Sequence, residues 1–152
     1  MTELATTAPI TKTVTVGCDV DTAFRVFTDE IGTWWPTEMH SVHKREVREL
    51  VFEGREGGEL YEVNRSGEKA HWARVTAWEP PTRLVLAWHV DPGRAAPTEI
   101  EVRFEPTDAG TAVELVHRHW ERLGADGQEA RDGYRSGWGP VLERFVEAVA
   151  AR

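Results

Sequence analysis

Hydrophobic and polar residues alternate along much of the chain up to about residue 120, as in β-strands that bury one face. In the stretch 98–105, Ile100, Val102 and Phe104 alternate with charged residues and should share the buried face. Turns rich in glycine or proline separate these stretches at spacings that allow hairpins but not the long crossovers of a parallel sheet. The pattern predicts antiparallel strands over residues 10–18, 47–52, 59–64, 70–78, 83–89, 98–105 and 111–120.

Two short helices are expected between the first and second strands. Asp19 can cap a helix that begins at Val20, because its carboxylate can accept the backbone N–H groups left free at a helix start. A second helix is expected over residues 30–34 and should end before Pro36, because the residue before a proline leaves the helical region. Adjacent helical residues differ by about 100° in direction. Of Trp34 and Trp35, one should therefore pack into the core and the other lie near a cavity mouth or a partner surface.

The last segment of the chain changes to a helical period. Apolar residues recur at steps of three and four from Tyr134 to Val149, which predicts one helix of roughly twenty residues with an apolar stripe. Pro140 falls inside this pattern without shifting its phase, so we expect a kinked helix rather than two separate ones.

These elements predict an α+β fold in which a curved antiparallel sheet of about seven strands holds the long C-terminal helix on its concave face. If the sheet curls widely enough, a chamber remains between the sheet and the helix. Residues 10–152 are expected to form this single domain, and residues 1–9 are expected to form a flexible N-terminal tail.

The amino-acid composition argues against some classes of binding partner for this protein. Eighteen Lys and Arg residues against 26 Asp and Glu give a net charge of −8, which disfavours nucleic acids and anionic membrane surfaces. No stretch approaches the ~18 apolar residues of a membrane span. The single cysteine, Cys18, and a beginning without the pattern of a signal peptide predict a cytoplasmic protein.

Tryptophan and histidine provide the candidate site residues. Seven tryptophans are an unusual number for this length, and each brings a large apolar surface with one N–H donor, which suits a core or a hydrophobic cavity. The period of two places His117 and His119, in the stretch LVHRHW, on the inward face with Val113 and Leu115. It also places His71 on the inward side of its strand. The two neighbouring histidines could be metal ligands, contacts to a ligand, or structural parts of the wall.

Several stretches of the chain resemble a known family. They are the first helix with its paired tryptophans, a glycine-containing hairpin, the Pro80-Pro81 turn, the last hairpin and the closing helix, written CDVDTAFRVFTDEIGTWWP, GGELYEV, WARVTAWEPPTRLVLAWH, TEIEVRFEPTDAGTAVELVHRHWE and GYRSGWGPVLERF. Their order resembles the helix-grip fold of the START-like (SRPBCC, Bet v-like) superfamily, in the branch named after the activator of the heat shock protein 90 ATPase. The resemblance implies a cavity for a hydrophobic ligand under the long helix. The superfamily includes lipid carriers, polyketide aromatases and cyclases, and oxygenase domains.

The strand order of that superfamily argues against a metal site. It places the strand of His71 three positions from that of His117 and His119, roughly 14 Å away at about 4.8 Å per strand. The inward neighbours on the adjacent strand are apolar, and His40 and His43 lie in a loop whose course the pattern does not determine. Because a catalytic zinc needs three protein ligands, we expect no metal and no cofactor, and interpret the histidines as parts of the pocket wall.

Three functions follow as hypotheses. The first is the binding of a small hydrophobic molecule, aromatic or acyl, between sheet and helix. The second is an enzyme resembling polyketide cyclases, which would use His117, His119 or Tyr134, although no catalytic residue is assigned. The third is an interaction module that docks on a chaperone or forms a homodimer through its sheet edge or the Trp34-Trp35 corner. The residues expected to contact a ligand are Trp35, His71, Trp88, His117, His119, Tyr134, Trp138 and Leu142.

Overall fold

A computed structural model describes residues 7–89 and 97–152 of the chain, so the first six residues of the predicted tail lie outside the described part. Seven strands form one sheet in which all neighbours are antiparallel, in the order β1-β7-β6-β5-β4-β3-β2. The predicted seven-stranded antiparallel sheet is confirmed. The strands are β1 (Ile10–Val16), β2 (Val47–Phe52), β3 (Glu59–Asn64), β4 (Lys69–Glu79), β5 (Arg83–Trp88), β6 (Thr98–Thr107) and β7 (Gly110–Arg118).

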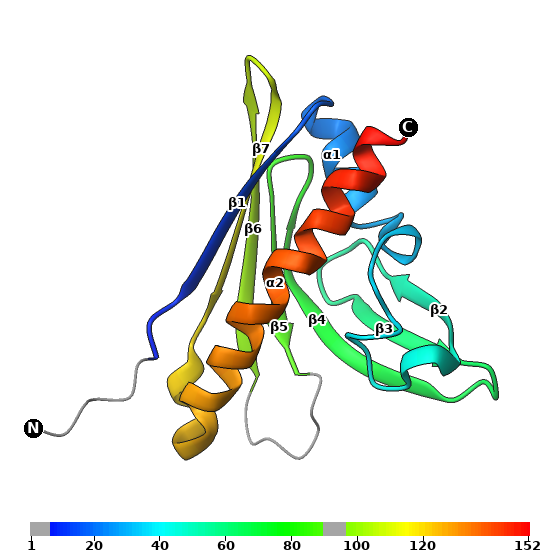
Figure 1. Ribbon diagram of the computed structural model, residues 1–152, viewed down its shortest axis with the longest axis vertical. Coiled ribbons are helices and arrows are strands. Elements are labelled where there is room, and N and C mark those ends of the chain that lie inside the picture. The colour runs from blue at the N-terminus through cyan, green and yellow to red at the C-terminus, as the bar shows by residue number, and fades with distance from the viewer. Residues whose placement is uncertain (1–6, 90–96) are drawn as a thin grey trace, which may run out of the picture.

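The long helix α2 (Gly127–Ala150) crosses the concave face of the curled sheet, and α1 (Val20–Phe27) lies beside its C-terminal end (Figure 1). The helix-grip arrangement is therefore confirmed. Asp19 caps α1 as predicted, because its carboxylate accepts the backbone N–H of Thr22 at 2.8 Å. The described part of the chain also contains the 3-10 segments η1 (Ile31–Thr33), η2 (Lys44–Glu46) and η3 (Trp120–Asp126), the last of which is kinked at Gly124.

Helix α2 is a single helix of 24 residues and runs through Pro140, so the expectation of one helix rather than two is confirmed. Proline cannot donate the backbone hydrogen bond that would reach Ser136. Both residues are exposed, so water can satisfy the carbonyl group that loses its partner. The helix starts at Gly127, seven residues before the first residue of the predicted apolar stripe.

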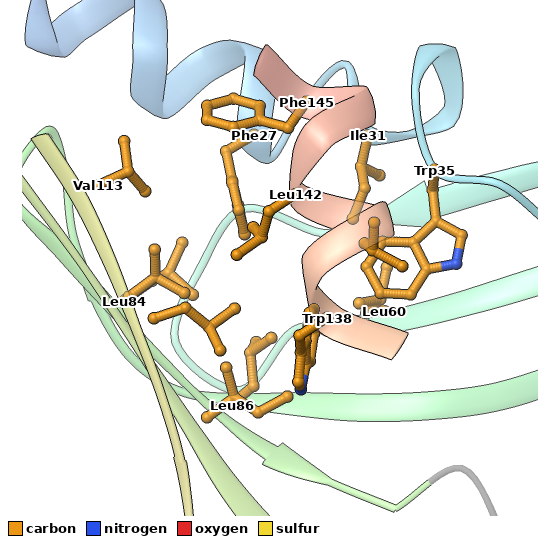
Figure 2. Packing of buried hydrophobic residues seen from close by; sticks show 14 of the residues in the cluster. Phe27, Ile31, Trp35, Leu60, Leu84, Leu86, Val113, Trp138, Leu142 and Phe145 are labelled. Atoms are coloured by element: carbon orange, nitrogen blue, oxygen red, sulfur yellow. The ribbon is translucent and has the colours of Figure 1, made fainter. Parts of the chain in front are cut away.

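The core lies between α2 and the concave face of the sheet (Figure 2). Leu84, Leu86 and Val113 point from the sheet towards Leu142 and Phe145 of the helix, and all five are buried. The period-two prediction for β6 is confirmed, since Ile100, Val102 and Phe104 are at most 3% exposed.

Strand β4 departs from the regular alternation of faces at a β-bulge. Leu60 of β3 pairs with Ala73 and the next residue, Tyr61, pairs with His71, so Trp72 is an extra residue between them. Trp72 and Ala73 are both buried as a result, and His71 turns to the outer face, where it lies 3.5 Å from Glu59. The predicted inward orientation of His71 is therefore wrong.

Strand β7 ends earlier than predicted, at Arg118. His119 has the left-handed backbone conformation, with φ of 72°, which breaks the alternation of the strand. The side chain of His119 consequently lies on the outer face, 3.7 Å from Glu99 and 3.2 Å from Glu121. The prediction that His117 and His119 share the inward face is wrong for His119.

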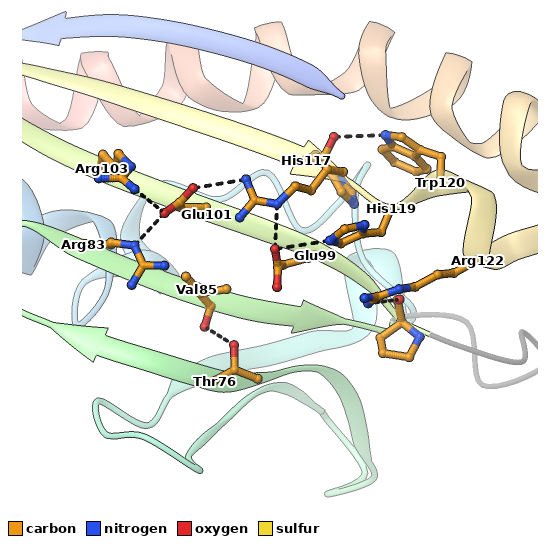
Figure 3. A network of polar contacts seen from close by, with 12 residues as sticks. Thr76, Arg83, Val85, Glu99, Glu101, Arg103, His117, His119, Trp120 and Arg122 are labelled. Atoms are coloured by element: carbon orange, nitrogen blue, oxygen red, sulfur yellow. Dashed lines mark hydrogen bonds and ion pairs between the residues drawn. The ribbon is translucent and has the colours of Figure 1, made fainter. Parts of the chain in front are cut away.

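Ion pairs between neighbouring strands cover the outer face of the sheet (Figure 3). Glu101 of β6 contacts Arg83 of β5, Arg118 of β7 and Arg103 of its own strand, while its side chain is only 8% exposed. Burial raises the pKa of Glu101, but hydrogen bonds from Arg83 and Arg118 outweigh it and lower the pKa below its ordinary value. The carboxylate therefore remains charged and holds three strands together.

Candidate ligand-binding pocket

A pocket of about 490 Å³ lies between α2, the loop over residues 36–44, η3 and the ends of β4, β5 and β6. This volume is within the usual range of about 300–1,000 Å³ for small-molecule sites. The pocket is lined by Trp35, Met39, His40, Ser41, Lys44, Trp72, Trp88, His89, Thr98, Trp120, Leu123, Glu129, Ala130, Gly133, Tyr134, Gly137, Trp138 and Val141.

Five tryptophans dominate the walls of the pocket. The ring of Trp35 lies 5.1 Å from that of Trp72, 5.7 Å from that of Trp138 and 6.2 Å from that of Trp88, measured between centroids. Trp120 belongs to η3 and is fully buried beneath Tyr134, with 5.5 Å between the ring centroids. Aromatic rings at these separations stabilise one another in tilted and edge-to-face arrangements, so the wall is held in place before any ligand arrives.

The indole N–H group of each of these tryptophans donates a hydrogen bond within the protein. A buried N–H group without an acceptor would cost free energy, and here none of the five is left in that state. Since the N–H groups are occupied, these rings present their apolar faces and edges to the pocket. The acceptors are His40 O for Trp35 (2.7 Å), Glu62 Oε1 for Trp72 (2.6 Å), Tyr134 Oη for Trp88 (2.9 Å), His117 O for Trp120 (3.0 Å) and His117 Nδ1 for Trp138 (3.1 Å).

His117 lies directly behind this wall and is fully buried. Because an indole N–H can only donate, the bond from Trp138 requires an unprotonated Nδ1 on His117. The proton of the neutral imidazole then lies on Nε2, which donates to Thr98 Oγ1 at 2.7 Å. Burial lowers the pKa of His117 to about 3. The imidazole is therefore neutral at physiological pH and holds the wall rather than transferring protons.

Glu62 holds the loop that forms the other side of the pocket. Its carboxylate is fully buried on β3 and accepts the backbone N–H groups of Val42 (2.7 Å) and His43 (2.8 Å). The same carboxylate accepts the indole N–H of Trp72. One buried carboxyl group therefore joins the loop to the tryptophan wall through three hydrogen bonds.

The structure brings four of the predicted ligand contacts into the pocket lining: Trp35, Trp88, Tyr134 and Trp138. His117 and Leu142 are buried behind the lining, and His71 and His119 lie on the outer face of the sheet. Trp34 packs against Phe27 and Phe145, and Trp35 lines the pocket as expected for one of the two indoles. The expectation that only one of them packs into the core is wrong, because both are buried in the same cluster with 5.8 Å between their ring centroids.

The sequence pattern missed Trp72, Trp120 and the loop residues of the lining. Trp72 was not predicted because a bulge turns its side chain to the other face of the sheet. Trp120 was not predicted because the chain leaves the strand at His119. Among the residues that the structure describes, no group of three or more His, Cys, Asp or Glu side chains could hold a metal ion. No helix in the described ranges is long and apolar enough to cross a membrane.

The curled antiparallel sheet, the helix across it and the pocket between them define a protein of the helix-grip class. The chain belongs to the family of activator of Hsp90 ATPase homolog 1-like proteins, whose model matches residues 18–150. No curated protein matches the sequence significantly.

Solved structures similar to this chain have varied roles. An anthrahydroquino-gamma-pyrone synthase, Txn09, solved in complex with SUM, is 31% identical, with 91% of this chain and 95% of that chain covered and a TM-score of 0.61. CalC, a self-sacrificing resistance protein of Micromonospora echinospora, is 27% identical, with 94% of each chain covered and a TM-score of 0.71. The Aha1 dimer of Colwellia psychrerythraea is 15% identical, with 93% and 96% covered and a TM-score of 0.68, which shows a shared fold alone.

The buried imidazole gives a prediction about pH. The folded protein keeps His117 neutral down to about pH 3, whereas the unfolded chain protonates it near pH 6.5. Unfolding therefore takes up a proton between these values, and this residue should lower stability by about 1.4 kcal/mol per pH unit as the pH falls. NMR at pH 5 should show a neutral imidazole with its proton on Nε2. A His117 signal that titrates near pH 6.5 in the folded protein would contradict this assignment.

The carboxylate of Glu62 gives a prediction about the loop. Glu62→Gln keeps the shape of the side chain but can place an NH₂ group against N–H donors, which should cost about 1–3 kcal/mol of stability. Trypsin should then cleave native protein faster after Lys44 and Arg45. Glu68→Gln, at an exposed position on the next turn, is the control and should change neither quantity. Equal cleavage of both variants and the wild type would show that Glu62 does not hold the loop.

Proposed function

We propose that the protein binds a planar aromatic small molecule in the pocket between α2 and the sheet. The observation that carries the proposal is the wall of five tryptophans whose N–H groups are all bonded within the protein. Such a wall offers flat apolar surfaces and few hydrogen-bonding groups, so it recognises a ligand mainly by shape and by stacking. A planar ring system matches these surfaces better than a flexible acyl chain.

The similar structures support this class of ligand. Txn09 is named as a synthase of an anthrahydroquino-gamma-pyrone, which is a fused polycyclic aromatic product. It is also the comparison with the highest identity among those described above. A cavity of about 490 Å³ is within the range used for molecules of that size. We therefore favour a polycyclic aromatic ligand over a lipid.

An enzyme of the cyclase kind is the second candidate, and the 31% identity to Txn09 is the observation that favours it. Two of the three residues first considered for catalysis, His117 and His119, do not suit proton transfer here, whereas the third, Tyr134, lines the pocket. His119 lies on the outer face, and the pKa of about 3 keeps His117 neutral under working conditions. A reaction would have to use Tyr134 or the polar residues on the open side of the pocket, and binding without chemistry requires no such group.

An interaction module is the third candidate. The Trp34-Trp35 corner, which was expected to offer an apolar docking surface, is buried at 4% and 9% exposure. Among the described residues, the exposed large hydrophobic side chains are Met39 and Val42, and both belong to the loop beside the pocket. Since docking surfaces usually expose a larger apolar patch, a homodimer or a chaperone contact remains a weaker hypothesis than small-molecule binding.

The proposal predicts saturable quenching of tryptophan fluorescence by 1,8-dihydroxyanthraquinone with one site per chain. Gly133 lines the pocket and has open space where a side chain would begin. Gly133→Leu should fill that space and weaken binding by about tenfold or more, an effect of roughly 1.4 kcal/mol.

Gly139→Leu is the matched control for this experiment. Gly139 belongs to the same helix and has open space around it, but it does not line the pocket. Both substitutions replace a helical glycine by a better helix former and should stabilise α2 to a similar extent. Only Gly133→Leu should change binding. Quenching that does not saturate, or an equal effect of both substitutions, would contradict the proposed site.

A further inference from the structure

The open side of the pocket differs from its tryptophan walls in having charged groups. Lys44 stands on the loop and Glu129 stands on α2, and both are exposed residues of the pocket lining. Ser41 also belongs to the loop and lines the pocket, but its hydroxyl donates to Thr37 O and accepts the backbone N–H of Lys44 at 2.8 Å. The hydroxyl is therefore already engaged, and Lys44 is the cation that the loop offers to a ligand.

The backbone of Lys44 is held in an unusual conformation. Its φ of 50° falls in the left-handed region, which is costly for a residue with a side chain. The loop enforces this conformation through neighbouring bonds, because Glu62 holds Val42 and His43 and Ser41 holds the N–H of Lys44 itself. Conformations of this kind persist where the surrounding structure fixes them, and they gather at ligand-binding sites.

The ammonium group of Lys44 retains capacity for a ligand. It donates one hydrogen bond to the carbonyl oxygen of Met39 at 3.0 Å, and a lysine ammonium has three N–H donors. In the described part of the chain, Lys44 has no carboxylate within the 4.0 Å of an ion pair. Lys69, by contrast, pairs with Glu59 at 3.1 Å on the outer face. An anionic oxygen at the pocket rim would therefore meet an unneutralised charge.

From this geometry we infer that Lys44 is a specificity-determining residue that selects aromatic ligands carrying an anionic oxygen group, such as a carboxylate or an ionised phenol. The inference rests on the proposed function and adds the polar part of the ligand. The ring system lies against the tryptophans, and the anionic edge points to the loop. Glu129, on the helix side of the pocket, repels an anion. The anionic group of the ligand is therefore favoured on the loop side, next to Lys44.

The test compares two probes that differ in one group, anthraquinone-2-carboxylate and 2-(hydroxymethyl)anthraquinone. Wild-type protein should bind the carboxylate about tenfold more tightly, and the preference should shrink as salt is raised because the Lys44 side is exposed. Lys44→Met should remove the preference and leave the affinity for the neutral probe within about twofold. Lys44→Arg should restore most of the preference, since arginine keeps the charge.

Lys69→Met is the control, because it removes an equal charge from the outer face of the sheet. It should leave the preference unchanged, which separates a contact in the pocket from a change in net charge. If wild-type protein binds both probes equally, or if Lys44→Met keeps the preference, the proposed role of Lys44 is contradicted. The proposed binding of an aromatic ligand in the pocket is then still supported. If wild-type protein binds neither probe, the proposed function itself is contradicted.

Discussion

A tryptophan can be buried at little cost only if its indole N–H finds an acceptor, and this requirement organises the half of the molecule that holds the pocket. The acceptors come from separate parts of the chain: His40 on the loop, Glu62 on β3, His117 on β7 and Tyr134 on α2. Each bond fixes a ring. Four of the five also join two elements, whereas the bond from Trp35 to His40 holds the loop itself. The wall, the loop and the long helix are consequently held as one unit around the cavity.

His117 is central to this arrangement because two indoles depend on it. It accepts from Trp138 through its ring and from Trp120 through its carbonyl group, and its remaining ring nitrogen reaches Thr98. The pair of histidines that looked like the start of a metal site is therefore divided between two faces. His117 accepts hydrogen bonds from the wall tryptophans, and His119 lies beside Glu99 among the ion pairs on the outer face of the sheet.

The regular elements could be predicted because each strand and helix has its own period. The predicted antiparallel sheet, the cap at Asp19 and the long helix were all found, and they needed only local patterns and a family resemblance. The failures occur where one residue interrupts a period. A bulge at Trp72 reverses the face of His71, and a left-handed residue at His119 ends β7. Neither the bulge nor the left-handed residue changes the composition of its segment, so the period-two alternation of residues could not reveal either of them.

The course of the loop over residues 36–44, which completes the pocket, could not be predicted for a different reason. Its course depends on the buried carboxylate of Glu62, which lies about twenty residues further along the chain. Glu62 has apolar neighbours on both sides, a pattern that predicts a surface position. Its buried position is explained only by the structure, in which three N–H groups donate to its carboxylate. The most specific feature of the candidate site, the position of Lys44 on the rim, depends on that interaction together with the bond from the Lys44 N–H to the Ser41 hydroxyl.

The claim that the tryptophan wall receives the ligand is tested most directly by following the indole N–H signals in an NMR titration with 1,8-dihydroxyanthraquinone. The signals of Trp35, Trp72, Trp88, Trp120 and Trp138 should shift and keep their protection from exchange, because their acceptors stay in place. Trp78, which packs against Phe24 and Phe52 away from the pocket, should not move. Unchanged signals for the five wall tryptophans at saturating ligand, or shifts centred on Trp78, would contradict the claim.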